Sequence, residues 1–177
     1  MKREINVLNH ATEIIQGLEG GVLLTTKADG KVNSMAIAWG MLGVEWRKPV
    51  FITFVREGRF TRTQLDKNAE FTVNIPYGAY DKNILTFCGT KSGRTTDKIK
   101  ELGLTLEAPL VVSVPGIKEL PLTLECKVIY KQKQDLQSIA PENQAFYPQN
   151  VDSSFPGANK NVAIAYYGEI VRAYFIE

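Results

Sequence analysis

Residues 21–40, GVLLTTKADGKVNSMAIAWG, contain two strand-like runs separated by Asp29-Gly30. An Asp-Gly pair favours a two-residue hairpin, because the turn that matches the twist of paired strands needs positive φ at its central positions. The two runs are therefore expected to pair as neighbouring antiparallel strands.

Four further runs rich in β-branched and aromatic residues predict strands: PVFITFVR (49–56), AEFTVNIP (69–76), ELPLTLECKVIYKQKQ (119–134) and NVAIAYYGEIVRAYFIE (161–177). Helical spacing is confined to short segments at 8–21, 59–68, 79–89 and 95–103. No βαβ repeat occurs, which argues against a Rossmann-type sheet. We expect one mainly β domain over residues 1–177. Its short helices would be inserted into a closed or nearly closed antiparallel barrel, because closure removes exposed strand edges.

The segment Asp135–Lys160 contains Pro141, Pro148, Pro156 and Gly157 and predicts an extended loop excursion. A loop of that length inside a compact domain is usually functional or poorly ordered.

The net charge is only +2, which indicates neither a nucleic-acid-binding nor a membrane-binding surface. The N-terminal residues carry charges and no long apolar run, so we expect neither a signal peptide nor a membrane span. Cys88 and Cys126 form no CxxC motif and predict reduced thiols in a cytoplasmic protein.

His10 is the single histidine. At the start of a helix it is expected to be a surface or capping residue, which leaves the usual Ser-His-Asp and Cys-His schemes without a base unless His10 serves. No HExxH, CxxC or carboxylate cluster at metal spacing occurs, so no metal is expected. No catalytic residue can be assigned.

Residues 87–103, FCGTKSGRTTDKIKELG, suggest an anion site. Gly89 and Gly93 have three residues between them and Arg94 follows, whereas a Walker A loop has four residues between its glycines and then Lys. Ser92 and Thr95 nevertheless offer hydroxyls next to a glycine, an arginine and an expected helix N-terminus. A capped helix preceded by a glycine turn explains the same residues without a ligand.

A second anion-binding corner is predicted in FVREGRFTRTQL. Arg56 and Arg59 flank Gly58 at the end of a strand, and Thr61 is expected to cap the following helix, with Arg62 solvated. Surface charges on a turn are the alternative.

The third segment is KVNSMAIAWGMLG, in which small residues alternate with larger apolar ones. The small set is Ser34, Ala36, Ala38 and Gly40, and the large set is Met35, Ile37, Trp39 and Met41. One strand face would be open to a flat ligand and the other would pack into the core; tight strand packing explains the small residues equally well.

Together these segments resemble the flavin reductase-like proteins, FMN-binding split barrels that include flavoredoxin-type members. NSMAIAWG is similar to the family's Asn-x-Met-Thr-x-x-Trp strand, and CGTKSGRTTDKIKELGL is similar to its Ser-Gly-Arg…Asp-Lys…Gly-Leu signature. VREGRFT, EFTVNIP and YYGEIVRAYF match other family segments, so the resemblance runs from about Glu19 to the end.

The resemblance implies a homodimer that binds FMN in a cleft near the subunit interface. It implies that Met35, Ala36, Ile37 and Ala38 line the isoalloxazine ring. It places Arg56, Arg59 and Thr61 at the ribityl-phosphate, with help from Asn74, and completes the site with Ser92, Gly93, Arg94 and Lys98. Asp97 is expected to orient a basic neighbour.

Two positions depart from the family pattern. Ala36 stands where many relatives have Thr, and Tyr166 and Tyr167 stand where several place His. Binding is expected to survive both changes, whereas a particular activity is not assured.

The functional expectation is an FMN-dependent oxidoreductase that takes electrons from NADH, NADPH or a protein partner and passes them to a small-molecule or protein acceptor. Three alternatives stay open: an FMN-carrying electron-transfer module, a split barrel that binds another phosphorylated ligand, and a dimeric barrel without a ligand. The sequence does not distinguish the donors, identify the acceptor, or say whether FMN stays bound.

Overall fold

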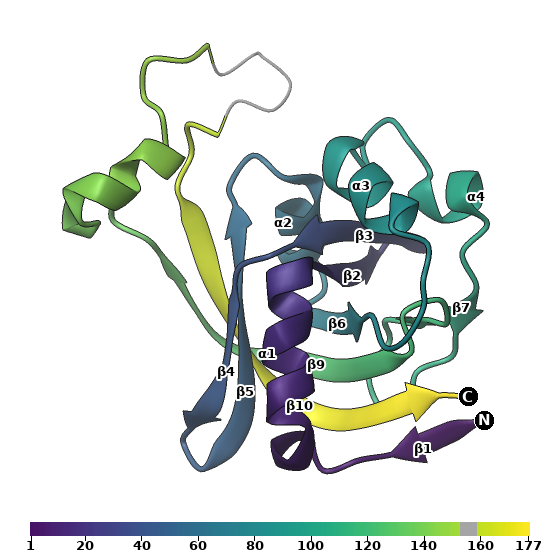
Figure 1. Cartoon of the computed structure of the whole chain (residues 1–177). Helices are drawn as coiled ribbons and strands as arrows, with labels where there is room; N and C mark the ends of the chain where they lie inside the picture. Colours follow the sequence, from purple (N-terminus) through teal and green to yellow (C-terminus); the bar gives the residue numbers. More distant parts are fainter. Residues whose placement is uncertain (153–158) are drawn as a thin grey trace.

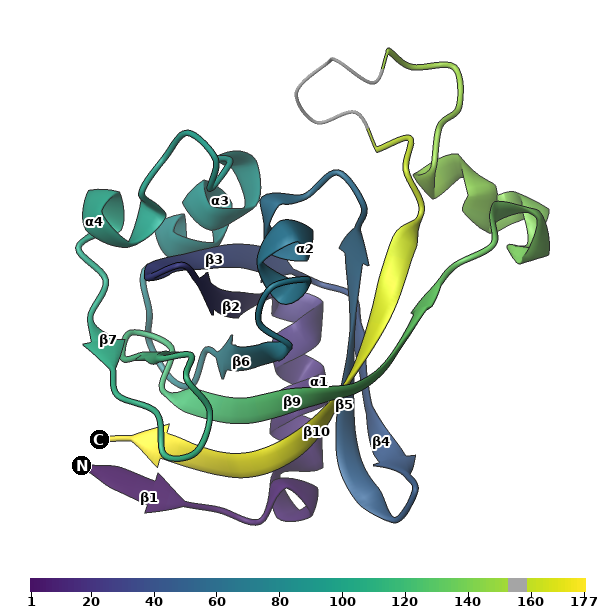
Figure 2. The same ribbon diagram turned by 180° about the vertical axis from the view of Figure 1, so that it is seen from behind.

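One antiparallel sheet of eight strands dominates the computed structural model, which describes residues 1–152 and 159–177. The strands in these residues are β1 (Lys2–Glu4), β2 (Val22–Ala28), β3 (Lys31–Ile37), β4 (Gly40–Glu45), β5 (Lys48–Arg56), β6 (Glu70–Ile75), β7 (Leu106–Glu107), β8 (Gly116–Ile117), β9 (Leu122–Lys133) and β10 (Ala163–Ile176). The sheet order is β3-β2-β6-β9-β10-β5-β4, with β1 joined to β10, while β7 and β8 form a separate pair (Figures 1 and 2).

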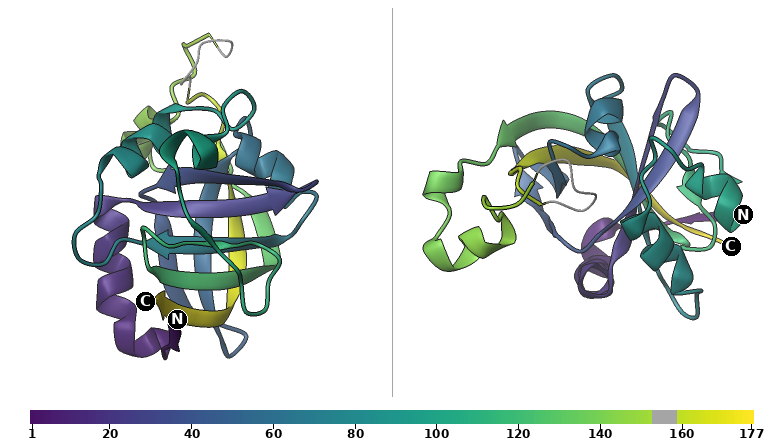
Figure 3. Two further views of the ribbon diagram at one scale, coloured as in Figure 1. Left: turned by 90° about the vertical axis from the view of Figure 1, so that its right-hand side faces the viewer. Right: turned by 90° about the horizontal axis from the view of Figure 1, so that it is seen from above.

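The sheet curls into a barrel that stays open between its two edge strands, β3 and β4 (Figure 3). These strands are consecutive in the chain and joined only by Ala38-Trp39, yet they stand at opposite ends of the strand order. The expected mainly β, nearly closed antiparallel barrel with short helices is thus confirmed.

The Asp29-Gly30 hairpin is also confirmed. Asp29 has φ 50° and Gly30 has φ 75°, and Ala28 pairs with Lys31 directly across the turn. Positive φ at both central residues is the geometry of a type I′ turn.

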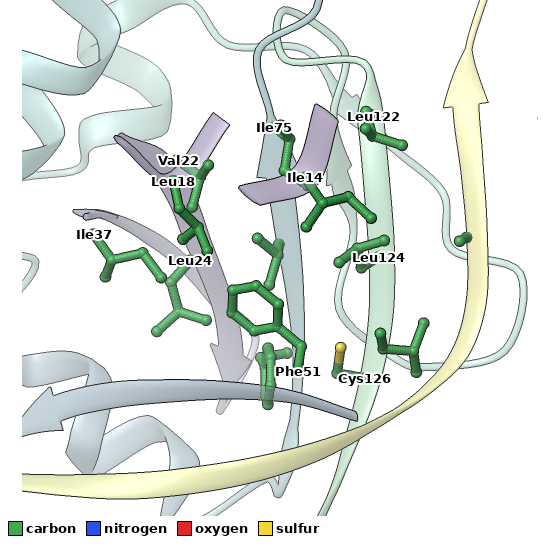
Figure 4. Close-up of a cluster of buried hydrophobic side chains, with 14 of the residues drawn as sticks. Ile14, Leu18, Val22, Leu24, Ile37, Phe51, Ile75, Leu122, Leu124 and Cys126 are labelled. Carbon is green, nitrogen blue, oxygen red and sulfur yellow. The ribbon is translucent and has the colours of Figure 1, made fainter. Parts of the chain in front are cut away.

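The barrel interior is filled by apolar side chains from both walls and from the first helix (Figure 4). Phe51, Leu24 and Leu124 come from different strands and are fully buried in one cluster. Ile14 and Leu18 enter the same cluster from α1. Because strand residues alternate between the two faces, each of these strands contributes every second side chain to the core.

The helices are α1 (Ala11–Gly20), α2 (Phe60–Leu65), α3 (Asn83–Thr90) and α4 (Lys98–Leu102), with 3-10 helices η1 (Val7–His10), η2 (Leu136–Ser138) and η3 (Pro141–Phe146). All four predicted helical segments are confirmed. α2, α3 and α4 pack on or beside β3, and a second apolar cluster lies beneath α3. Three helices therefore meet the edge strand at the opening of the barrel.

The predicted excursion at Asp135–Lys160 leaves the barrel where β9 and β10 extend beyond it (Figure 1). It contains the helical turns η2 and η3, so it is not extended throughout. Pro156 and Gly157 lie outside the described residues.

His10 stands at the N-cap of α1 but makes no capping hydrogen bond with its side chain, so of the two expected roles, surface or capping residue, the capping role is wrong. The side chain is half-buried at the surface. Its ring packs edge-on against Phe175, with the centroids 5.6 Å apart. Within the described ranges no helix is long and apolar enough to cross a bilayer. In the same ranges, no three His, Cys, Asp or Glu side chains gather as metal ligands.

Candidate functional site: a basic cleft beside an open strand

Two adjoining hollows lie at the edge strand β3. The larger, which we call the basic cleft, measures about 270 Å³ and is lined by Asn33, Met35, Ala36, Gly58, Arg59, Phe60, Thr61, Cys88, Gly89, Thr90, Lys91, Ser92, Gly93 and Lys98. The smaller, the strand slot, measures about 180 Å³ and is lined by Met35, Ala36, Ile37, Ala38, Trp39, Phe54, Arg56, Arg59, Asn159 and Ala163. They share Met35, Ala36 and Arg59, so a single ligand can extend through both.

Gly93 fits the Ser92–Arg94 turn tightly against β3. A Cβ at this position would lie 2.1 Å from Asn33 Oδ1 and 2.7 Å from Phe60 Cδ1. Lys31 Nζ donates a hydrogen bond to the Gly93 carbonyl oxygen over 2.6 Å, which holds the turn to the strand from the other side. Only glycine allows this close approach of the backbone.

Lys98 is a nearly buried cation in the wall of the cleft, with only 3% of its surface exposed. Its Nζ donates one hydrogen bond to the Cys88 carbonyl oxygen over 3.2 Å. Burial lowers the pKa of Lys98; Cys88 opposes that shift, and the charges of Arg59 and Lys31 add to it. No carboxylate is among the described residues that line the cleft. An anion in the cleft would supply the missing counter-charge.

Thr61 and Asn33 form a polar pair at the floor of the cleft. Asn33 Nδ2 donates to Thr61 Oγ1 over 3.1 Å, and both residues are buried. Thr61 is the second residue of α2, and the N-cap is Arg59 without a side-chain capping bond, so the expected capping role of Thr61 is wrong. The Thr61 hydroxyl accepts the bond from Asn33, so its own proton is available for donation to a ligand in the cleft.

The strand slot runs along the end of β3. Ala36 and Ala38 leave room on its surface, while Ile37 packs in the barrel core and Met35 packs partly against it. The expectation that Trp39 and Met41 pack into the core as well is wrong: they are 40% and 56% exposed. The reason is that β3 ends at Ile37, so the alternation of faces does not continue past it.

Ser34 is also not open to a ligand, because it lies buried in the sheet. Its hydroxyl shares a hydrogen bond with Thr25 Oγ1 over 2.8 Å. Of the small residues expected on the open face, Ala36 and Ala38 are those that line the slot.

Arg56 lines the strand slot but is largely occupied by the chain itself. Its Nη1 donates to the carbonyl oxygens of Asn159 and Asn161 over 2.9 and 3.0 Å, and its Nη2 donates to that of Phe146 over 2.8 Å. The guanidinium also stacks on Tyr147, 4.4 Å from the ring centroid. Burial lowers the pKa of Arg56, Tyr147 opposes that shift, and Arg59 adds to it. Arg56 therefore anchors Phe146, Asn159 and Asn161 to the end of β5.

Arg59 faces both hollows and donates through Nη2 to the Asn159 side-chain oxygen over 3.1 Å. Arg56 donates to three backbone carbonyl oxygens, whereas this Arg59 bond goes to one side-chain amide, which a ligand can displace. Arg59 is thus placed where a ligand that spans the two hollows would pass.

Two of the predicted residues line neither hollow. Asn74 is buried in the sheet, where its Oδ1 accepts from Thr25 Oγ1 over 3.0 Å and its Nδ2 donates to Thr123 Oγ1 over 3.2 Å. Arg94 is exposed, with its guanidinium 5.6 Å from the ring centroid of Phe60 at the cleft.

The predicted helix N-terminus behind the Ser92 turn is wrong. The Ser92 carbonyl oxygen accepts from the N–H groups of Thr95 and Thr96 over 3.2 and 3.0 Å, which closes a separate turn. α4 starts only at Lys98, and its first turn is capped by Asp97, whose Oδ1 accepts from the Lys100 N–H over 3.2 Å. Asp97 therefore caps a helix, and the expectation that it orients a basic neighbour is wrong.

The tyrosines at the position where relatives place His lie away from the two hollows. Tyr166 is buried in the barrel core, where burial, followed by the charge of Asp66, raises the pKa of its hydroxyl to about 12. Tyr167 is half-buried on the outer face of β10.

Sequence reasoning missed several lining residues. Asn33 could have been found from its i, i+2 spacing to Met35, which puts both on one face of a strand. Phe60 and Lys91 are direct neighbours of predicted residues. Asn159 had no signal, because it reaches the slot from a segment about a hundred residues away.

Comparison with known proteins gives the same fold. The Flavin reductase like domain model matches residues 18–140. A flavoredoxin from Methanosarcina acetivorans is 27% identical with a TM-score of 0.63, and the match covers 89% of this chain and 68% of that one. An FMN-binding domain of flavin reductases-like enzyme from Shewanella baltica OS155 is 17% identical with a TM-score of 0.69, covering 99% and 77%.

An uncharacterized protein from Archaeoglobus fulgidus is 30% identical over 99 residues, which are 56% of this chain. The match spans 55% of that relative, about half its length. The domain model alone covers well over half of the chain, and the split barrel agrees with it. The chain therefore belongs to the flavin reductase-like domain family.

Proposed function

We propose that this chain binds FMN across the basic cleft and the strand slot and passes electrons through it as an oxidoreductase. The observation that carries the proposal is the nearly buried Lys98 beside Arg59, in a cleft whose described lining includes no carboxylate. A phosphate that is close to dianionic at neutral pH is the ligand group that such a site favours.

The proposed placement follows the shape of the two hollows. The phosphate lies in the basic cleft near Thr61, Ser92 and Lys98, and the ring lies in the strand slot against the Ala36–Ala38 backbone. Arg59, which lines both, stands beside the ribityl chain. Flavin chemistry needs no side-chain base to accept a hydride, because the ring itself is the acceptor. This agrees with a cleft lined without histidine among its described residues.

The test is the colour and cofactor content of the purified full chain. We expect a yellow protein that releases FMN on denaturation, identified by chromatography against an FMN standard. A colourless protein that shows no change in flavin absorbance or fluorescence on titration with FMN would overturn the proposal. Binding of another phosphorylated compound under those conditions would support the alternative ligand class.

We further propose that NADH or NADPH supplies the electrons, as expected for an enzyme and not for a carrier. Anaerobic addition of either nucleotide should bleach the flavin absorbance. Loss of colour only with a reduced protein donor would instead identify an electron-transfer module.

A homodimer is proposed from the outer face of the sheet. Met41 on β4, Trp46 in the turn after β4 and Tyr130 on β9 are between 42% and 58% exposed, and the rings of Trp46 and Tyr130 meet edge to face. Apolar patches of this kind on a protein surface mark interaction sites. Light scattering should give twice the mass of 19.7 kDa, and Trp46→Lys should shift it toward the monomer. A monomer at all concentrations would contradict the proposal.

We propose that residues 1–177 act as one FMN-binding domain in the cytoplasm. Cys88 and Cys126 are both buried and unpaired, as is common in a reducing compartment. Cell fractionation with an antibody to the native protein tests the location.

A further inference from the structure

We propose that a third hollow, next to the strand slot, binds a flat, uncharged aromatic carbonyl compound of the quinone class. This hollow, the aromatic pocket, measures about 280 Å³ and is lined by Trp39, Gln134, Ile139, Asn143, Phe146 and Tyr147. Its size is near the lower end of small-molecule sites, which run from roughly 300 to 1,000 Å³. A ligand of one or two fused rings is the appropriate size.

Three aromatic rings shape the pocket. Trp39 meets Phe146 edge to face, with centroids 5.4 Å apart and an interplanar angle of 87°. Tyr147 is tilted by 60° at 6.3 Å from Trp39. Trp39 and Phe146 are 40% and 55% exposed, so ring surface is left for a guest. Aromatic guests gain from offset stacking or edge contacts on such surfaces.

The polar groups of the pocket are carboxamides. Tyr147 Oη donates to Gln134 Oε1 over 2.9 Å, which leaves the Gln134 amide nitrogen as a donor to a ligand. Asn143 contributes a second carboxamide. A quinone carbonyl is an acceptor that matches these donors.

No carboxylate, ammonium or guanidinium group is among the described residues that line the pocket. Arg56 lies 5.5 and 4.4 Å from the ring centroids of Trp39 and Tyr147 but does not line the pocket, and three of its five N–H donors are bound to backbone carbonyl oxygens. The pocket thus differs from the basic cleft, and a charged ligand would enter it without a partner.

Trp39 also lines the strand slot, so the aromatic pocket and the slot share a wall. The role of the bound quinone as electron acceptor rests on the proposed function. There, reduced FMN, itself reduced by NADH or NADPH, would give the quinone two electrons and one proton as a hydride. A second proton from solvent would complete the hydroquinone, and the flavin would return to its oxidised form. Binding of the quinone does not depend on that step.

The experiment uses the two tryptophans of the chain as paired reporters. Tetramethyl-1,4-benzoquinone, which has no free ring position to react with thiols, is titrated into the ¹⁵N-labelled full chain with and without FMN. Trp46→Phe assigns the two indole N–H signals. We expect the Trp39 signal to shift saturably while the Trp46 signal stays in place. Absence of a shift at Trp39, or equal shifts of both signals, would overturn the proposal.

Variants on the exposed side of the pocket complete the test. Phe146→Ala should weaken quinone binding by about three- to tenfold through the loss of one aromatic contact. The variant leaves intact the Phe146 backbone carbonyl to which Arg56 donates.

Asn143→Asp should weaken quinone binding at least as much as Phe146→Ala, because it adds a charge to the pocket. Asn150→Asp, on the same segment, is the matched control. Unchanged affinity in Phe146→Ala and Asn143→Asp would reject the site. Quinone binding in a protein that fails to bind FMN would support the pocket and reject the proposed function, and the reverse result would do the opposite.

Discussion

Arg56 and Lys98 show two ways in which this fold treats a buried or half-buried cation. Arg56, at the end of β5, donates to three carbonyl oxygens of the 146–161 segment and stacks on Tyr147. Lys98, in the wall of the basic cleft, has one carbonyl partner and two cationic neighbours that lower its pKa further. The comparison teaches that the number of basic residues is a poor guide to a site. What matters is how many of their donors the chain has already used.

The largest expected effect comes from removing the Lys98 charge. Lys98→Met should weaken FMN binding by about 1.5–3 kcal/mol, or roughly 10- to 150-fold, because a charge-assisted contact is lost. The same change should raise the stability of the flavin-free protein, because a buried charge disappears. Fluorescence titration and thermal unfolding measure the two effects.

Lys100→Met is the matched control for Lys98→Met. Lys100 is exposed on the same helix, so both FMN affinity and stability should stay near wild type. Equal losses of FMN affinity in the two variants would contradict the assignment of Lys98 as the lysine that contacts the FMN phosphate.

The next effect separates the two arginines. Arg56→Met should destabilise the protein by roughly 1.5–3 kcal/mol by leaving carbonyl groups without their charged donor, and should speed amide exchange in residues 146–152 and 159–161. FMN affinity should change less than threefold. Arg59→Met should do the reverse, lowering FMN affinity by more than tenfold with little effect on stability. An affinity loss in Arg56→Met as large as that in Arg59→Met would break the comparison.

Gly93→Ala tests the fit of the turn that closes the cleft. The added Cβ would overlap Asn33 Oδ1 and Phe60 Cδ1, so the variant should lose about 1–3 kcal/mol of stability and bind FMN more weakly. Gly20→Ala, where a Cβ meets nothing within 4 Å, is the control for a glycine replacement that fits. Wild-type stability in Gly93→Ala would show that the turn is not held as described.

The smallest expected effect is a pH dependence. Because burial lowers the folded-state pKa of Lys98 from 10.5, the unfolded chain binds more protons between the two pKa values. The stability of the flavin-free protein should therefore rise as pH increases through the folded-state pKa toward 10.5, and FMN affinity should fall over the same range. Lys98→Met should lose this component in calorimetry carried out across that range. A wild-type curve that falls where the variant stays flat would contradict the assignment.

The sequence predicted the local parts of this structure well. Asp29-Gly30 specified its hairpin, because the positive φ values that the turn requires restrict which residues can stand there. Gly93 likewise indicated the Ser92–Arg94 turn.

The sequence-based predictions about the caps at His10, Thr61 and Asp97 were wrong, because a cap depends on the residue at which the helix begins. The other misses depended on contacts between distant segments. The carbonyl partners of Arg56 come from residues 146–161, and Asn74 is turned into a buried network by threonines on β2 and β9. Neither arrangement leaves a pattern along the chain.

The missing pairing between β3 and β4 has a mechanical consequence at the site. Because no ladder of backbone hydrogen bonds joins β3 to β4 in the described residues, this seam can widen by bending at Ala38-Trp39 without breaking one. Trp39 lines both the strand slot and the aromatic pocket, so a ligand in either hollow would displace the same two-residue link, Ala38-Trp39. A change in the separation of β3 and β4 would then accommodate ligands of different thickness, while the paired strands of the barrel keep their positions.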